Sequence, residues 1–253
     1  MIESIAKILG RCGSENPVLP PTQLYNEGWM LRLILDWFAR NRGVEHPLTF
    51  TPEACWYSEA LLPSHFPPRA RGDAKAESYT HADGVIGHFT IDSGERGYAK
   101  LLPGVKQFIV AEAKLRSTLS AGIKNSPTYD QAARTVACIA QMFEITNVRP
   151  DSVDRLAFFV IAPEAQIRSG VFTDLVTKQS IEKKVRARVG AFEASGDAWF
   201  EKSFLPTLVH IEIGTLAWET ILDDLPITGE IDQIREFYRL CLRYNRLGSN
   251  NAI

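Results

Sequence analysis

The sequence predicts an α/β fold, a three-layer α/β/α sandwich with a central mixed sheet, and two observations support it. Short apolar segments of strand composition alternate along the chain with longer segments whose apolar residues recur at helical period. The segment 153–163, VDRLAFFVIAP, is apolar almost throughout, which is typical of a parallel strand buried on both faces. Helices that cross back between parallel strands cover both faces of their sheet. A sheet between two helical layers is therefore expected.

The helices are predicted from apolar stripes at helical period. Residues 23–40 carry one such stripe, which includes Leu31 and Leu35. In residues 128–145 the apolar face contains several alanines, which permit close packing onto a sheet. Further helical segments follow at 164–190, near 215–223 and near 229–247.

The strands are predicted from short apolar or aromatic runs that polar or turn-forming residues bound. The run 105–115, VKQFIVAEAKL, is the one that ends in charged residues of both signs. Together with this run, strands are expected near 55–61, near 82–91, over 153–163 and in 207–214.

Length and composition favour one domain. With 253 residues, 45% of them hydrophobic, the chain can bury a sizeable core. We expect a single domain over 1–253, with its core over about 20–215 and a C-terminal helical extension over about 216–253. The longest fully apolar run, 156–162, is too short to span a bilayer, which predicts a cytoplasmic protein without a membrane partner. The four cysteines form no C-x-x-C pair and are expected to be reduced thiols.

Charged residues at the end of the 105–115 strand indicate a reactive site. The strand ends in Glu112, Ala113 and Lys114, and Asp83 lies on an earlier strand-like segment. Because side chains alternate across a strand, Glu112 and Lys114 are expected on one face and Ala113 on the other. If the strand with Asp83 pairs alongside, Asp83 and Glu112 can share a hard divalent cation, and Lys114 would lie beside its bound water. This arrangement predicts metal-assisted hydrolysis of a phosphodiester bond.

An acid followed two positions later by a lysine occurs three times in the chain. The copy at 73–75, Asp-Ala-Lys, lies in a polar segment rich in proline and arginine. The copy at 182–184, Glu-Lys-Lys, lies among charged residues at helical spacing, which is typical of a solvated helix face. The copy at 112–114 alone follows an apolar strand, and a surface ion pair at a strand end is the alternative interpretation for it.

Glu27 is a candidate because of its position in the 23–40 helix. At about 100° per residue it falls within the apolar stripe, whereas Arg32, Asp36 and Arg40 cluster on the opposite side. A carboxylate on a core-facing stripe is unfavourable unless it is paired, hydrogen-bonded or bound to a metal. The alternative is an acid in the first turn, where it complements the helix dipole.

Gln131 is a candidate because its helix directly follows the strand that ends at Lys114. Backbone donors and a glutamine at this helix start are suited to orient a phosphate or a metal-bound water. Thr128 and Gln131 also fit a capping box, in which the glutamine only satisfies the first amide of the helix. Both interpretations are open at this point.

The order of these elements resembles the PD-(D/E)XK nuclease superfamily over roughly residues 20–165. The resemblance implies a restriction-endonuclease-like core and a deoxyribonuclease that hydrolyses DNA phosphodiester bonds with Mg²⁺ or Mn²⁺. It implies metal binding at Asp83, Glu112 and Ala113, with Lys114 assisting the water. The full set of expected catalytic residues is Asp83, Glu112, Lys114, Glu27 and Gln131, of which the last two would support the site.

Two positions depart from the pattern of the superfamily. Gly84 follows Asp83 and no proline precedes the aspartate, and Thr135 stands where the RecB-like branch has a tyrosine. The branch therefore stays undetermined. The competing class is a catalytically silent module that keeps the fold and binds nucleic acid or a protein partner, and the presence of both acids and the lysine argues against it.

Charge bears on the expected partner, which is DNA, with RNA left open. A formal net charge of −2 argues against a protein held on nucleic acid by bulk electrostatics, so local patches must supply the phosphate contacts. A homodimer would provide the paired sites that double-strand cuts need. The candidate nucleic-acid-binding residues are Arg69, Arg71 and Lys75 in a loop before Asp83, and Arg116, Lys124 and Arg134 after the motif.

Overall fold

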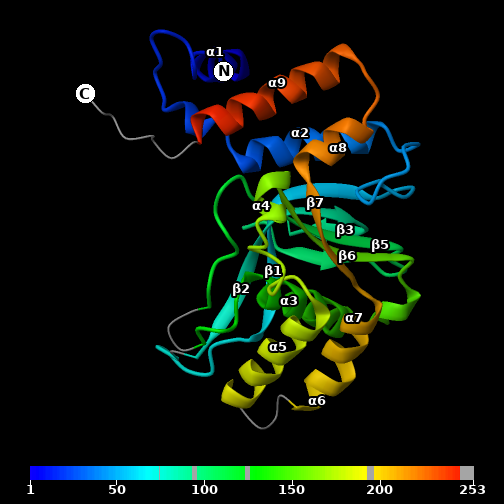
Figure 1. Ribbon diagram of the computed structural model, residues 1–253. Helices are drawn as coiled ribbons and strands as arrows, with labels where there is room; N and C mark the ends of the chain where they lie inside the picture. Colours follow the sequence, from blue (N-terminus) through cyan, green and yellow to red (C-terminus); the bar gives the residue numbers. More distant parts are fainter. Residues whose placement is uncertain (74, 93–95, 123–125, 193–196, 246–253) are drawn as a thin grey trace.

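A five-stranded mixed sheet forms the centre of the computed structural model, with the strand order β1-β2-β5-β6-β7 (Figure 1). β1 pairs antiparallel with β2, and β2 pairs antiparallel with β5, whereas β5, β6 and β7 run parallel. The strands are β1 Cys55–Phe66, β2 Glu77–Gly87, β5 Gln107–Ala113, β6 Arg155–Ala162 and β7 Glu212–Ala217. The structure describes residues 1–73, 75–92, 96–122, 126–192 and 197–245.

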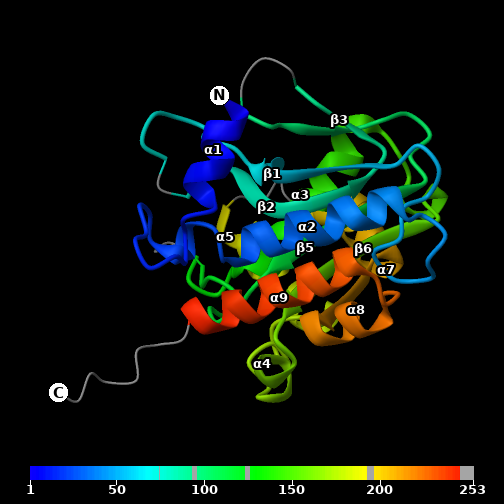
Figure 2. The same cartoon turned by 90° about the horizontal axis from the view of Figure 1, so that it is seen from above.

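One face of the sheet is covered by three helices, α2 (Glu27–Arg40), α8 (Trp218–Asp224) and α9 (Gly229–Tyr244) (Figure 2). Alternate residues of the central strands point toward them, among them Ala111 of β5 and Phe159 of β6. Helices α8 and α9, which lie in the segment expected to be an extension, thus share one hydrophobic core with α2. The expected boundary near residue 215 falls inside β7.

The opposite face is covered by α3 (Gln131–Thr146), α5 (Lys178–Phe192) and α7 (Leu205–His210), which continues a π-helical turn over Phe200–Phe204. The intervening residues of the central strands point to this side, among them Val110 and Val160. Because β5 and β6 are buried on both faces, they are apolar at nearly every position. The predicted α/β fold with a mixed sheet between helical layers is confirmed.

None of the helices in the described part of the chain is long and apolar enough to cross a membrane.

Several short helices and a hairpin complete the described chain. The small elements are α1 Ile2–Leu9, a 3₁₀ turn at Pro21–Gln23, a hairpin of β3 Phe89–Ile91 with β4 Ala99–Leu101, a 3₁₀ turn at Pro150–Ser152, α4 Glu164–Arg168 and α6 Asp197–Trp199.

Side-chain caps and glycines move several predicted boundaries. α2 begins at Glu27 because the side chain of Asn26 accepts a hydrogen bond from Trp29 N over 3.0 Å. The strand expected over 82–91 is interrupted at Gly87, whose φ of 145° allows a close approach to Gln107 that an added Cβ would block. The helix expected over 164–190 is divided into α4 and α5.

The strand predicted in 207–214 is wrong over its first half. Residues up to His210 belong to α7, and β7 begins at Glu212. The alternating pattern of TLVHIEIG resembles a strand, but Leu208 packs into the α3-side core from a helix. Thr207 Oγ1 also donates to Ser203 O of the preceding turn over 2.8 Å. Tertiary packing therefore decides this segment against its local pattern.

Candidate functional site

The predicted pairing of the strands that carry Asp83 and Glu112 is present. β2 and β5 are paired up to Gly84 and Ala111. Beyond this pair, Asp83 Oδ2 accepts the N–H of Ala113 over 2.8 Å, so a side-chain carboxylate replaces the next backbone acceptor. The Ala113 side chain itself is buried in the α2-side core, on the face away from Glu112, as predicted.

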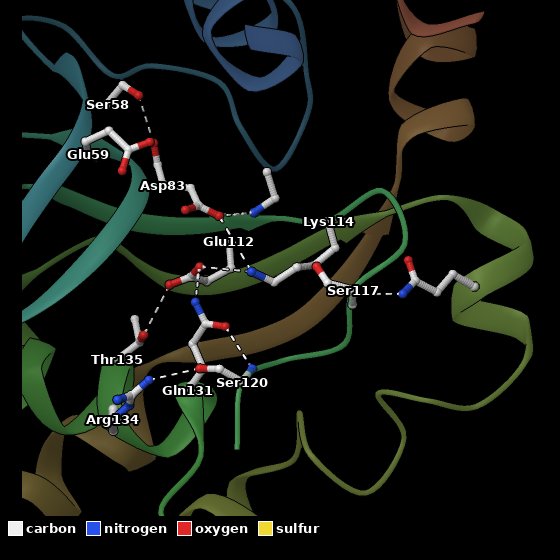
Figure 3. A network of polar contacts seen from close by, with 12 residues as sticks. Ser58, Glu59, Asp83, Glu112, Lys114, Ser117, Ser120, Gln131, Arg134 and Thr135 are labelled. Carbon is white, nitrogen blue, oxygen red and sulfur yellow. Dashed lines mark hydrogen bonds and ion pairs between the residues drawn. The ribbon is translucent and has the colours of Figure 1, made fainter. Parts of the chain in front are cut away.

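Glu112 is fully buried and points toward α3. Gln131 Nε2 donates to Glu112 Oε2 over 2.7 Å, and Thr135 Oγ1 donates to Glu112 Oε1 over 3.3 Å (Figure 3). Both donors lie on the first turns of α3, four residues apart and therefore on one face of the helix. Thr135, which stands where a RecB-like nuclease has a tyrosine, thus donates a hydrogen bond to the same carboxylate as Gln131.

Lys114 joins the two carboxylates. Its Nζ lies 3.8 Å from Asp83 Oδ2 and 3.7 Å from Glu112 Oε2. Its backbone is held on both sides, because Lys114 N donates to Ile161 O over 2.8 Å and Trp218 Nε1 donates to Lys114 O over 2.9 Å. The structure therefore brings Asp83, Glu112 and Lys114 together at the end of β5.

Burial perturbs the protonation of Glu112. Its pKa is raised well above the ordinary value, first because burial penalises the charged form and second because of the negative charge of Asp83. The charge of Lys114 acts in the opposite direction. Two carboxylates thus share one ammonium in a site from which water is largely excluded. A divalent cation would offset the remaining negative charge.

The capping-box interpretation of Gln131 is wrong. Asp130, not Thr128, caps α3, because Asp130 Oδ1 accepts the N–H of Ala133 over 3.1 Å. The Gln131 side chain is thereby free to reach Glu112 with its nitrogen, while its oxygen accepts the N–H of Ser120 over 3.2 Å.

The cap residue Asp130 is itself held by Lys184 of α5, with Nζ 2.7 Å from Asp130 Oδ2. Lys184 was expected on a solvated helix face, but its side chain is largely buried in this ion pair. The reason is that α5 packs against α3, which the charge pattern of 182–184 does not reveal. In the 73–75 copy, Asp73 pairs with Arg69 over 2.8 Å.

Sequence reasoning missed an irregularity shared by β1 and β2. The two strands are paired at Ser58–Gly84 and at Ala60–Ala82, but not between these pairs, at Glu59 and Asp83. Glu59 has a φ of 60°, which is the left-handed region and is unfavourable for a glutamate. Such irregularities redirect side chains and are common beside functional sites. No pattern in the sequence around Glu59 signals it.

The acidic side chains of the site and the lysine between them differ in their exposure to solvent. The exposed fraction of the side chain is 53% for Glu59, 24% for Asp83, 10% for Lys114 and 0% for Glu112. Burial and the charge of Asp83 raise the pKa of Glu59. Figure 3 shows Glu59 beside Asp83, which lies between Glu59 and Glu112. Side-chain exposure therefore increases from Glu112 through Lys114 and Asp83 to Glu59.

Gly84, one of the departures from the superfamily pattern, has a packing reason. A Cβ at this position would lie 2.9 Å from both Leu31 Cδ2 and Leu35 Cδ1 of α2. The missing side chain lets α2 rest directly on β2 beside Asp83.

Glu27 is the first residue of α2 and is half-buried. Its charge acts on the Cys241 thiol of α9, whose pKa rises to about 12, mainly through burial. Within the described part of the chain, no hydrogen bond or ion pair joins Glu27 to Asp83, Glu112 or Lys114. Its first-turn position agrees with the alternative interpretation, in which it complements the helix dipole.

The candidate basic residues lie in two places. Arg69 and Lys75 belong to the loop between β1 and β2, where Lys75 Nζ donates to Ala191 O over 2.9 Å and Arg69 stacks on Phe192. Arg71, in the same loop, is exposed. The loop ends where β2 begins, at Glu77, and Asp83 lies six residues further along this strand, which corresponds to about 20 Å. The structure therefore does not bring this loop to the carboxylates.

The remaining basic residues are engaged near the site. Arg134 donates to Ser120 Oγ over 3.0 Å and pairs with Glu77 over 3.5 Å. Arg116 donates to Asn245 O. Lys124 lies outside the described residues.

The donor set fits a hard cation only in part. Among the described residues, no group of three or more His, Cys, Asp or Glu side chains is arranged to hold a metal. Asp83 and Glu112 are two oxygen donors, and water or backbone oxygens would have to complete the shell, as is usual for Mg²⁺. No protein-family model, curated protein or solved structure matches the chain.

Proposed function

We propose that the protein is a metal-dependent nuclease that hydrolyses DNA phosphodiester bonds on a restriction-endonuclease-like core. The observation that carries the proposal is the position of Lys114 Nζ, within 3.8 Å of Asp83 Oδ2 and 3.7 Å of Glu112 Oε2. Two acids from neighbouring strands and one lysine are what a hydrolase needs to hold a cation beside a positioned water. This part of the chain also carries the resemblance to the PD-(D/E)XK superfamily.

Each residue has a role that its contacts support. Asp83 and Glu112 would hold Mg²⁺ or Mn²⁺, which when bound lowers the pKa of water and neutralises phosphate charge. Lys114 donates a hydrogen bond to the attacking water or to the charge that develops on the phosphate. Ala113 fixes Asp83 through its backbone N–H. In the overall reaction the water oxygen bonds to phosphorus, the bond between phosphorus and the leaving oxygen breaks, and the leaving oxygen takes up a proton to balance the one that the water loses.

The supporting residues keep the buried carboxylate in place. Gln131 and Thr135 together bind both oxygens of Glu112, which prevents it from rotating away. Glu27 stands one turn before Leu31, which contacts the Gly84 position. Of the two predicted helix residues, Glu27 therefore has weaker support for a role in the site than Gln131, which bonds to Glu112.

The test is cleavage of linear duplex, circular duplex and single-stranded DNA with Mg²⁺, with Mn²⁺ and with EDTA. Asp83→Asn, Glu112→Gln and Lys114→Met should each lower the rate at least about 100-fold, because each removes a group that acts on the reacting atoms. Lys183→Met, at an exposed lysine of α5, should leave the rate unchanged. Metal-dependent cleavage that persists in Asp83→Asn or Lys114→Met would show that the site is wrongly assigned.

A catalytically silent module is the second candidate, and the small number of metal-ligating side chains among the described residues favours it. Such a module would bind nucleic acid or a protein partner with the same fold. Binding of DNA without cleavage under every metal condition would support this candidate over the nuclease.

A further inference from the structure

Arg32 of α2 lies at the edge of the candidate site. Its Nε donates to Ser58 Oγ over 2.9 Å, and Ser58 Oγ donates to Asp83 O over 3.1 Å. One hydroxyl therefore separates the guanidinium from the residue that carries the more exposed site carboxylate. The helical period predicts Arg32 on the polar face of α2, and in the structure both Ser58 and Glu59 of β1 lie within its reach.

The guanidinium has donor capacity to spare. Besides the bond to Ser58, its described polar partner is Glu59, and this ion pair is long, with 3.4 Å between Nη2 and Oε1. A guanidinium carries five N–H donors in a planar fork. A phosphate accepts two of them in parallel and is a stronger partner than a half-exposed carboxylate at that distance.

Trp29 places an aromatic surface next to this cation. The Arg32 guanidinium lies 5.1 Å from the centroid of the Trp29 ring, and 36% of Trp29 is exposed. An exposed tryptophan beside an arginine is suited to stack an unpaired base while the arginine binds the adjoining phosphate. The two side chains are held together because they are three residues apart on one helix.

We propose that Arg32 and Trp29 bind a single-stranded stretch of nucleic acid next to the scissile phosphate. Arg32 binds the neighbouring phosphate, and Trp29 stacks on the base attached to it. The ligand is single-stranded because a base within a duplex does not expose its face. The position relative to the scissile phosphate rests on the proposed function, whereas the binding itself needs no metal.

The test is the affinity of the full chain for a fluorescein-labelled oligodeoxythymidylate of about 12 nucleotides, measured by anisotropy in EDTA, with a duplex of equal length for comparison. Trp29→Ala should weaken binding of the single strand about 5- to 100-fold, and Trp29→Phe should retain most of it. Arg32→Gln should weaken binding and reduce the salt dependence of the logarithm of affinity by about 0.7, the contribution of one phosphate.

Matched controls separate binding from folding. Arg40→Gln removes an arginine of the same helix that pairs with Asp36 and Glu230, and it should leave binding unchanged. Arg32→Lys keeps the charge but not the fork, so it should retain the salt dependence and lose part of the affinity. Thermal unfolding of each variant shows whether a loss of binding reflects a loss of fold.

Three results would overturn the inference: no measurable binding of the single strand, tighter binding of the duplex, or an affinity that Trp29→Ala and Arg32→Gln leave unchanged. Its failure is distinguishable from that of the nuclease. Cleavage that requires Asp83 together with binding that ignores Trp29 contradicts only the inference. Binding that depends on Trp29 without cleavage in any metal contradicts only the nuclease.

Discussion

Gln131 Nε2 donates a hydrogen bond over 2.7 Å to Glu112 Oε2, from the first turn of α3 to a fully buried carboxylate on β5. The oxygen of the same amide accepts from Ser120 N, in the loop that connects the two elements. A side-chain amide suits this bridge, because it donates at one end and accepts at the other. The contact joins the predicted strand and helix residues into one site.

Removing this bridge should impair the site without unfolding the protein. Gln131→Leu takes a donor from the ionised form of Glu112, which raises the pKa of that carboxyl further and should lower the cleavage rate about 10- to 100-fold. The acid limb of the pH–rate profile should move to higher pH. Gln141→Leu, at a glutamine on the same helix that contacts His65, is the control. An unchanged rate and profile in Gln131→Leu would contradict a role for Gln131.

Glu112 should destabilise the metal-free fold at neutral pH. Its pKa is raised in the folded state, so the stabilisation linked to its protonation is complete below the ordinary glutamate pKa and is lost as the pH rises through the raised value. Glu112→Gln removes the buried charge and should raise the free energy of unfolding at pH 7 in EDTA by about 1–3 kcal/mol. Urea unfolding of the wild type and of Glu112→Gln across pH 4–8 measures this difference in the free energy of unfolding.

The control for this prediction is Glu15→Gln, at an exposed glutamate, which should leave the pH dependence of stability as it is in the wild type. Added Mg²⁺ should stabilise the wild type and not Glu112→Gln, because a ligand that binds only the folded state raises its stability. A Glu112→Gln variant less stable than the wild type in EDTA would show that its hydrogen bonds outweigh the buried charge.

Gly84→Ala should disturb the packing of α2 on β2. The added methyl group would lie 2.9 Å from Leu31 and Leu35, so we expect a loss of about 1–3 kcal/mol in unfolding free energy and a lower cleavage rate, because Asp83 is the adjacent residue. Gly190→Ala is the control, since nothing lies within 4 Å of a Cβ there and the residue is within α5. It should stabilise the helix by about 0.5–1 kcal/mol.

The ion pair between Lys184 and Asp130 should stabilise the fold more than the charged sequence around Lys184 indicates. Lys184→Met leaves the capping carboxylate of Asp130 largely buried without its partner, and should lower the free energy of unfolding by about 2–4 kcal/mol. Lys183→Met removes the neighbouring exposed lysine and should change it by less than about 0.5 kcal/mol. Equal effects of the two substitutions in thermal or urea unfolding would contradict the assignment.

The sequence predicted the elements whose patterns are long or strongly apolar. The stripe of α2, the alanine-rich face of α3 and the continuous apolar run of β6 are local signals, and each element is present. α7 was missed because it is only six residues long and its apolar and polar residues alternate as they do in a strand. Its burial, through Leu208, comes from tertiary packing. The left-handed Glu59 was missed because the interrupted pairing between β1 and β2 at this residue has no local sequence signal.

The sequence by itself determined which residues meet along β5, since alternation on a strand places Glu112 and Lys114 on one face and Ala113 on the other. Only the tertiary structure decided which more distant side chains reach them. Asp83 arrives through the register of β2, Gln131 through a cap that Asp130 supplies, and Arg32 through the contact of α2 with β1. These contacts depend on side-chain directions set by packing between elements, which local patterns of residues do not encode.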